Sequence, residues 1–162
     1  MKRKSSKPST KIATEDRVRN AVVGHIAQNG FSGNLKIKSG DQQGVDISAT
    51  HKDSIARRIF IETKGNSPGC NKNLAIHTAW GQIMGRVTSL NANRIHGLGF
   101  PKEWEENVAK LSSPVVAKKL NVRYYFVDTH GTVEEFTAAR FHRKHPRTRK
   151  KKKATRGRKI FN

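Results

Sequence analysis

The order of hydrophobic and polar positions along the chain predicts alternating helices and strands. Residues 14–31 repeat apolar side chains every three or four positions, as in an amphipathic helix that begins after Thr14 and ends near Gly30. Other segments carry apolar residues at every second position or in short runs, as strands do. The predicted order is a helix, three strands, a helix, a strand, a helix and two strands, over residues 14–31, 34–40, 44–50, 57–65, 74–90, 97–100, 101–120, 121–128 and 133–136. This order predicts a mixed sheet with helices against it, in the α/β or α+β class.

Two of these segments make specific predictions about burial. In the strand 34–40, Leu35 and Ile37 are expected to point inward. Gly81 and Gly85 interrupt the helix 74–90, and glycine costs about 1 kcal/mol relative to alanine inside a helix. We therefore expect close packing of both glycines against the sheet. The apolar stripe of this helix is predicted to be Ile76, Trp80, Ile83, Val87 and Leu90.

The two strands 44–50 and 57–65 are separated by HKDS, a turn candidate, and predict a hairpin. With the turn centred near Ser54, Asp46 falls opposite Glu62. Directly opposed carboxylates repel each other, and a divalent cation compensates for this repulsion. Mg²⁺ is commonly held by one or two carboxylates together with phosphate oxygens. Because side chains alternate along a strand, Lys64 projects from the same face as Glu62.

This arrangement has two interpretations. Asp46, Glu62 and Lys64 are either solvent-facing strand residues or a hydrolytic site. In a hydrolytic site, a metal-activated water attacks a phosphodiester, and Lys64 accepts its proton or stabilises the developing charge. Glu62 and Lys64 form the only acid-x-Lys pair in the chain.

Along the chain, the sequences GVDI and IETKG follow a predicted helix that carries Glu15 and precede a predicted helix that carries Gln82. In this order they resemble the PD-(D/E)XK nuclease superfamily, and the similarity covers about residues 12–137. The resemblance implies an α/β domain with a restriction-endonuclease-like mixed sheet flanked by helices. It also implies a Mg²⁺-dependent DNA endonuclease, with Mn²⁺ able to replace Mg²⁺ and no other small-molecule cofactor.

The resemblance assigns roles residue by residue. Asp46 and Glu62 would bind the metal, with assistance from Glu15, and Lys64 would be the catalytic lysine. Gln82 matches a glutamine on the helix that follows the lysine strand in several branches.

Two positions depart from the family pattern, and they leave the branch open. Val45 stands where the family has a proline, and Arg86 stands where some branches have a tyrosine. The features of residues 14–31 are similar to those of Holliday-junction resolvases, which act as dimers, so a homodimer is one expected assembly. The helix that carries Gln82 and the C-terminal hairpin are more similar to restriction or defence-type nucleases.

Lys and Arg are concentrated at the two ends of the chain. The formal net charge is +21, and the first eleven residues hold five Lys or Arg while residues 140–162 hold twelve, with no acid in either segment. We therefore divide the chain into a basic N-terminal arm (1–11), the nuclease domain (12–139) and a basic C-terminal tail (140–162). The arms have too few apolar residues to offset the entropy of ordering, so they are expected to be disordered in the free protein.

DNA is the expected partner of these basic residues, because each cation that meets a phosphate releases condensed counterions. A solubilising tail and binding to a membrane surface are the alternatives, although no amphipathic apolar face accompanies the basic run. A non-catalytic, architectural or ribosome-like nucleic-acid-binding protein on the same fold is the alternative function. The residues expected to contact nucleic acid are Arg86, Arg147, Arg149, Lys150, Lys151, Lys152, Lys153, Arg156 and Arg158.

The remaining composition narrows the compartment and the chemistry. Cys70 is the single cysteine, which excludes an internal disulfide and a Cys-rich zinc site. No stretch has the length and apolarity of a membrane span or of a signal peptide. We therefore expect a cytoplasmic or nucleoid-associated protein, or a nuclear one in a eukaryotic host.

Overall fold

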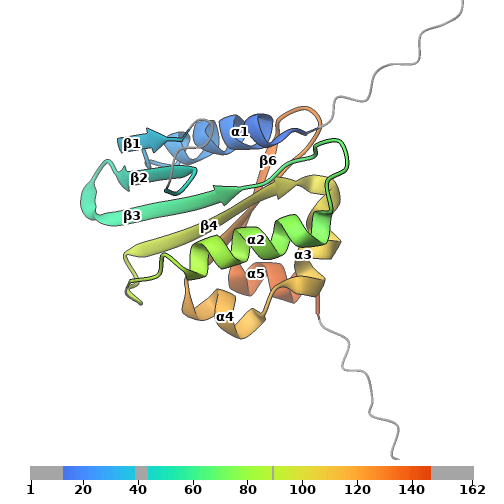
Figure 1. Ribbon diagram of the computed structural model, residues 1–162. Helices are drawn as coiled ribbons and strands as arrows, with labels where there is room; N and C mark the ends of the chain where they lie inside the picture. The colour runs from blue at the N-terminus through green and yellow to red at the C-terminus, as the bar shows by residue number, and fades with distance from the viewer. Residues whose placement is uncertain (1–12, 39–43, 89, 147–162) are drawn as a thin grey trace, which may run out of the picture.

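The computed structural model describes residues 13–38, 44–88 and 90–146, which form a six-stranded sheet with helices on both faces (Figure 1). The strands follow chain order across the sheet, from β1 at one edge to β6 at the other. Pairs β3–β4 and β4–β5 are parallel and the other three are antiparallel. The prediction of a mixed sheet flanked by helices is therefore confirmed.

The elements also follow the predicted order, except that three short helices occupy residues 101–120, with a break before Pro114, and one further helix follows the last strand. Their bounds are α1 (Glu15–Gln28), β1 (Gly33–Ile37), β2 (Ile47–His51), β3 (Ser54–Thr63), α2 (Lys72–Met84), β4 (Arg94–Pro101), the short 3₁₀ helix η1 (Lys102–Trp104), α3 (Glu105–Leu111), α4 (Pro114–Lys119), β5 (Val122–Val127), β6 (Val133–Thr137) and α5 (Ala138–Lys144).

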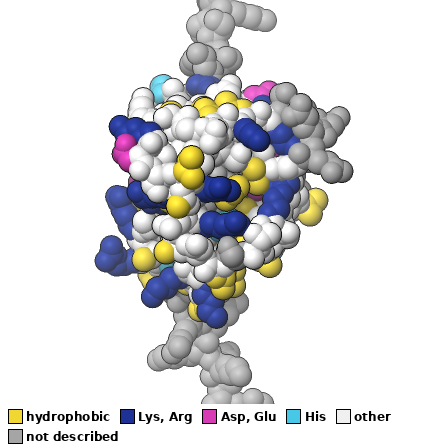
Figure 2. Space-filling view, turned by 90° about the vertical axis from the view of Figure 1, so that its left-hand side faces the viewer, with side chains coloured by type: hydrophobic (Ala, Val, Ile, Leu, Met, Phe, Trp, Pro, Cys, Tyr) yellow, Lys and Arg dark blue, Asp and Glu magenta, His cyan; other side chains and the backbone are white. Residues whose placement is uncertain are grey.

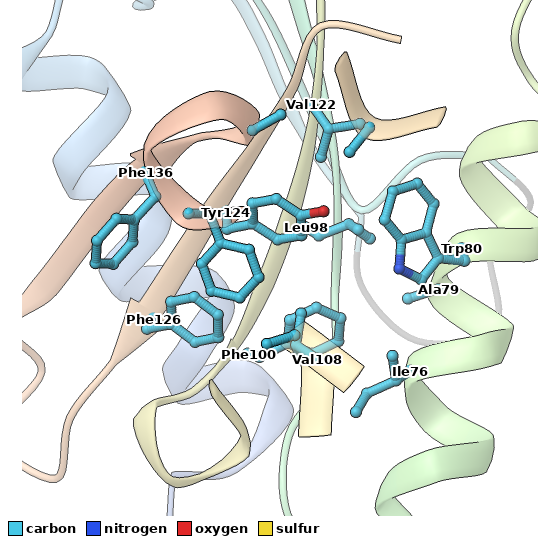
Figure 3. Packing of buried hydrophobic residues seen from close by; sticks show 14 of the residues in the cluster. Ile76, Ala79, Trp80, Leu98, Phe100, Val108, Val122, Tyr124, Phe126 and Phe136 are labelled. Carbon is cyan, nitrogen blue, oxygen red and sulfur yellow. The ribbon is translucent and has the colours of Figure 1, made fainter. Parts of the chain in front are cut away.

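Two hydrophobic clusters lie on opposite faces of the sheet, because side chains alternate along each strand. On one face, α1 packs Val18, Val22 and Ile26 against apolar residues of β2 to β5. On the other face, α2, α3, α4 and α5 cover aromatic residues of β4 to β6, with Tyr124 and Phe126 fully buried among them (Figure 3). The predicted catalytic residues Glu62 and Lys64 lie where this second face meets the end of β3.

The start and end of α1 agree with the sequence. The Thr14 side chain accepts a hydrogen bond from the Arg17 backbone N–H, as an N-cap does. Gly30, with φ of 88°, adopts the left-handed conformation that ends a helix.

Three predictions about burial are wrong. Ile37 is 47% exposed, because β1 is the edge strand and has a neighbour on one side only. A Cβ on Gly81 would meet no atom within 4 Å, so this glycine does not pack against the sheet. The helix α2 ends at Met84, where Gly85 forms its C-cap, and Leu90 therefore lies outside the helix and is 68% exposed.

The segment 97–100 belongs to a longer strand than its sequence indicates. Strand β4 has eight residues and is central in the sheet, although Gly97 and Gly99 lower its apparent β propensity. A Cβ on Gly99 would lie 3.4 Å from Val18 Cγ1 and from Val22 Cγ2. The missing side chain thus gives α1 its close approach to the middle of the sheet.

Helix α5 crosses residue 139, the predicted end of the domain, and Phe141 is fully buried in the core. The folded region therefore continues through the first residues of the basic segment. Glu105, at the start of α3, holds α5 in place. Its carboxylate lies 2.7 Å from Lys144 Nζ and 2.8 Å from His145 Nε2, at the end of α5. The same carboxylate also pairs with Lys102 Nζ at 2.6 Å.

The surroundings of Glu105 predict a pH dependence of stability. Burial alone would raise the pKa of this carboxyl, but hydrogen bonds from Lys102, Lys144 and His145 outweigh burial and lower the pKa to about 2. A carboxyl whose folded pKa is depressed stabilises the protein above its unfolded pKa, and this contribution is lost as pH falls toward the folded value. We expect the melting temperature to drop more between pH 4.5 and pH 2 in the wild type than in Glu105→Gln. Parallel melting curves of the two proteins over this range would contradict the assignment.

Within the described ranges, no helix has both the length and the apolar character needed to cross a membrane.

Candidate functional site

The end of strand β3 carries the predicted catalytic pair. By strand alternation, Glu62 lies on the sheet face that α2 covers, and Lys64 follows it on the same face. Glu62 is fully buried, and the Lys64 side chain is 17% exposed. Lys64 also continues the parallel ladder, because its backbone N–H donates to the Gly99 carbonyl at 2.9 Å. The pair is therefore held by the rigid centre of the sheet.

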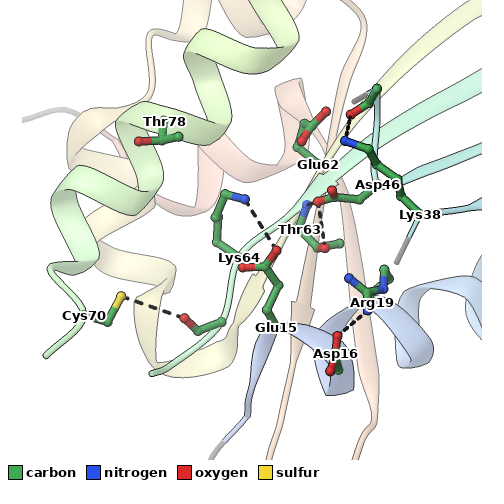
Figure 4. Close-up of polar contacts among 12 residues, drawn as sticks. Glu15, Asp16, Arg19, Lys38, Asp46, Glu62, Thr63, Lys64, Cys70 and Thr78 are labelled. Atoms are coloured by element: carbon green, nitrogen blue, oxygen red, sulfur yellow. Dashed lines mark hydrogen bonds and ion pairs between the residues drawn. The ribbon is translucent and has the colours of Figure 1, made fainter. Parts of the chain in front are cut away.

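The hairpin brings Asp46 to this pair, in the predicted register. Ile47 pairs with Ile61 in the β2–β3 ladder, so the next position before β2 faces Glu62. The Asp46 carboxylate turns to Thr63, whose backbone N–H and hydroxyl donate to Oδ2 at 2.7 and 3.0 Å (Figure 4). Both bonds go to one carboxylate oxygen, and Oδ1 is left for another ligand.

The start of α1 supplies the third predicted carboxylate. Glu15 Oε1 lies 3.5 Å from Lys64 Nζ (Figure 4). The contact depends on a close approach of two backbones, because a Cβ on Gly65 would lie 2.1 Å from the Glu15 nitrogen. The Asn66 N–H donates to the Ala13 carbonyl at 2.9 Å and closes the same junction. The structure therefore places Glu15 beside the lysine.

Gly65→Ala should separate α1 from the end of β3. The new Cβ would lie 2.1 Å from backbone that cannot move without shifting the helix, and such overpacking costs about 1–3 kcal/mol. We expect a lower midpoint in denaturant unfolding. Gly24→Ala is the matched control: its Cβ meets no atom within 4 Å, so it should stabilise the helix by up to about 1 kcal/mol. Equal stability of Gly65→Ala and the wild type would show that the junction is loose.

Helix α2 and the residues just after it close the site with Gln82 and Arg86. Arg86 forms an ion pair with Glu62 through Nη1 and Oε1, and its Nη2 donates to the Gly44 carbonyl at 2.7 Å. Among the described residues, the buried side-chain atoms without a hydrogen-bond partner include both carboxylate oxygens of Glu62, Gln82 Oε1 and Arg86 Nη1. This ion pair engages Oε1 of Glu62, and Oε2 is the carboxylate oxygen that has no partner in the described part of the chain.

These unsatisfied oxygens fit a metal ion. Within residues 13–38, 44–88 and 90–146, no three His, Cys, Asp or Glu side chains form a ready metal-binding cluster. Mg²⁺ does not need one, because it is usually held by one or two carboxylates plus waters and substrate phosphates. Asp46 and Glu62 supply such a pair. Glu15, which is paired with Lys64, is placed to act on the metal only through the lysine or a water.

Some functional positions were missed from the sequence, and others lie outside the described residues. Thr63 orients Asp46 and Gly65 admits Glu15, but no period or motif distinguishes them from other small residues. The Cys70 thiol donates to the Gly65 carbonyl at 3.8 Å. The predicted nucleic-acid contacts outside the described residues are Arg147, Arg149, Lys150, Lys151, Lys152, Lys153, Arg156 and Arg158.

Comparisons of the chain with family models, with curated proteins and with solved structures gave no match. Any functional assignment therefore rests on the residues and geometry described above.

Proposed function

We propose that the protein is a Mg²⁺-dependent DNA endonuclease with a restriction-endonuclease-like fold of the PD-(D/E)XK type. One observation carries the proposal: a fully buried glutamate, with one oxygen paired to Arg86 and the other without a hydrogen-bond partner, lies at the end of a central strand, with Asp46 opposite and Lys64 two residues on. A buried carboxylate in this state is costly unless a function retains it.

Each residue has a defined part in this proposal. Asp46 and Glu62 would hold Mg²⁺, which Mn²⁺ can replace, and the ion would lower the pKa of a water and neutralise charge on the phosphate. Lys64 is positioned to orient the attacking water and to stabilise the negative charge that develops on the phosphoryl oxygens. Glu15 keeps the ammonium of Lys64 in place through their 3.5 Å contact. Gln82, on the helix that covers this face of the sheet, has a buried amide oxygen without a hydrogen-bond partner.

DNA as the substrate is supported by charge. The chain carries a formal net charge of +21, and such a field speeds the encounter with a polyanion. Besides its ion pair with Glu62, Arg86 can donate hydrogen bonds to a phosphate of the DNA, because a guanidinium has several donors in one plane. A Holliday-junction resolvase is an alternative within this class, and a homodimer is proposed with it.

The proposal is tested by incubating the full chain with linear, supercoiled, single-stranded and branched DNA, with Mg²⁺, with Mn²⁺ and with EDTA. We expect cleavage of at least one substrate with either metal and none with EDTA. Intact DNA in every metal-containing reaction, beside a nuclease that cuts the same panel, would overturn the proposal.

The second candidate is a non-catalytic nucleic-acid-binding protein, supported by the twelve Lys or Arg of residues 140–162. Under this function the protein binds the DNA panel and cuts none of it. Deleting residues 147–162, which lie after α5, should flatten the salt dependence of binding under either function.

A further inference from the structure

The sheet face that carries Glu62 continues away from the site as an open trough. This trough has a volume of about 370 Å³ and lies over the β1–β2–β3 part of the sheet. Its lining includes Asn34, Lys36, Ser48, Ile55, Arg58 and Phe60. The nuclease chemistry proposed above uses none of these residues.

The trough lies on the same sheet face as the candidate site. Arg58, Phe60 and Glu62 are alternate residues of β3 and therefore share one face of the sheet. With a rise of about 3.3 Å per residue, Phe60 lies about 7 Å and Arg58 about 13 Å along the strand from Glu62. Ser48 stands in the same relation to Asp46 on β2. A chain held in the trough would thus run along the sheet toward the proposed metal-binding carboxylates.

The lining has the chemistry of a nucleotide site. Lys36 and Arg58 are exposed cations, and no acidic residue lines the trough in the described part of the chain. The Phe60 ring is half-buried and stacks on His96 at 6.1 Å between centroids, which supports it as a flat surface. A positively charged groove with an aromatic platform is typical of single-stranded nucleic-acid binding.

Asn34 gives a second, independent indication. Its φ is 45°, and the β1–β2 register shifts between Gly33 and Lys36. Such bulges redirect a side chain, and they occur often next to functional sites. Here the irregularity adds an amide to the lining of the trough, where it can donate to and accept from the edge of a base.

We propose that the trough binds an unpaired nucleotide of the DNA strand beside the scissile phosphate, so that the preferred substrate contains a single-stranded segment. The volume of about 370 Å³ lies at the lower end of the range for pockets that hold one small molecule. A base pair brings two nucleotides and a second backbone and does not fit. Phe60 stacks on the base, and Lys36 and Arg58 pair with its flanking phosphates.

The surrounding surface favours the same polyanion. Figure 2 shows the end of the molecule where β2 turns into β3, and its charged side chains are mostly Lys and Arg. Arg57 and Arg58 are neighbours on β3 but face opposite sides of the sheet. Arg57 lies 5.4 Å from the centre of the Phe31 ring, away from the trough, and is therefore a matched control for Arg58.

The test measures binding of the full chain in EDTA by fluorescence anisotropy, with two probes: a blunt DNA duplex and the same duplex with an unpaired extension. Stacking of one base on an aromatic ring contributes about 1–3 kcal/mol, so the extended probe should bind about five-fold tighter or more. Phe60→Leu and Arg58→Ala should bring the two affinities together while leaving blunt-duplex binding nearly unchanged. Arg57→Ala, with the same loss of charge, should retain the preference.

Two outcomes overturn the proposal. One is equal affinity of the wild type for both probes. The other is an equal loss of preference in Arg57→Ala and Arg58→Ala, which would show that only the net charge matters. Because Arg58 is exposed, its variant should fold normally, and unchanged thermal melting confirms this for both trough variants.

This inference rests on the proposed function only where it places the bound nucleotide beside a scissile phosphate. Binding in the trough and DNA cleavage can therefore fail separately. A preference for unpaired DNA without any cleavage would retain the trough and reject the nuclease. Cleavage that requires Lys64 but is equally fast on blunt and extended DNA, in the wild type and in Phe60→Leu, would retain the nuclease and reject the trough.

Discussion

Lys64→Ala should abolish DNA cleavage and leave DNA binding intact. Lys64 follows the buried Glu62 by two residues. Its ammonium lies 3.5 Å from the Glu15 carboxylate, which holds it in position. Removing one group that stabilises developing charge in a closed site typically lowers the rate by about 10²–10³-fold. Initial cleavage rates of the two proteins with Mg²⁺, on the best substrate of the panel, measure the effect.

The control for this variant is Lys52→Ala, which removes the same charge from the exposed turn of the same hairpin. Its cleavage rate and affinity should match those of the wild type. If Lys64→Ala cuts at the wild-type rate, the lysine has no part in the chemistry. If Lys52→Ala loses as much activity as Lys64→Ala, the effect comes from total charge, and the assignment of a catalytic lysine fails.

Arg86→Ala should destabilise the metal-free protein more than the loss of a surface arginine does. Glu62 is fully buried, and Arg86 is the cation that contacts its carboxylate in the described structure. Removing one partner of a buried ion pair leaves the other charge uncompensated and costs about 3 kcal/mol. For a chain of this size, that corresponds to a melting temperature about 6–12 °C lower. Thermal melting in EDTA measures the change, and Arg58→Ala is the exposed-arginine control.

Mg²⁺ distinguishes a structural ion pair from a metal site. If Glu62 and Asp46 bind the ion, Mg²⁺ replaces the missing cation, and it should raise the melting temperature of Arg86→Ala more than that of the wild type. In Glu62→Gln the buried charge is gone, so adding Arg86→Ala to it should cost far less than in the wild type. A loss in Arg86→Ala that persists with Mg²⁺, and that is just as large when Glu62→Gln is also present, would assign Arg86 to packing alone.

The Arg86–Glu62 ion pair also links two parts of the candidate site. In the structure the guanidinium of Arg86 connects Glu62 to the Gly44 carbonyl, on the segment that leads to Asp46. One side chain therefore joins the two strands that carry the proposed metal ligands. This contact keeps the two carboxylates near each other although they carry the same charge.

The arrangement of elements could be predicted from the sequence because it depends on local periodicity. Helical spacing of apolar residues and a cap at Thr14 define α1, and alternating residues define β2 and β3. The β2–β3 register agrees with the prediction from Ile47 to Thr50, although a register shift beside the turn pairs His51 with Ser54. Periodicity failed where burial depends on distant neighbours. The alternating pattern predicts that Ile37 is buried, but this residue lies on an edge strand and is exposed. Gly97 and Gly99 lower the apparent β propensity of β4, although this strand is central in the sheet.

The sequence by itself determined that Glu62 and Lys64 share one face, because strand alternation is a local property. The register that sets Asp46 opposite Glu62 agrees with the prediction, but it depends on a register shift beside the turn. Only the tertiary structure decided what surrounds them. Glu15 reaches Lys64 from a distant part of the chain because Gly65 admits the start of α1, and Arg86 reaches Glu62 because α2 crosses the same face. These contacts depend on how helices dock on the sheet, which is set by side-chain shape and by the absence of a Cβ at single positions. The chain therefore specifies its reactive groups locally and their electrostatic environment through packing.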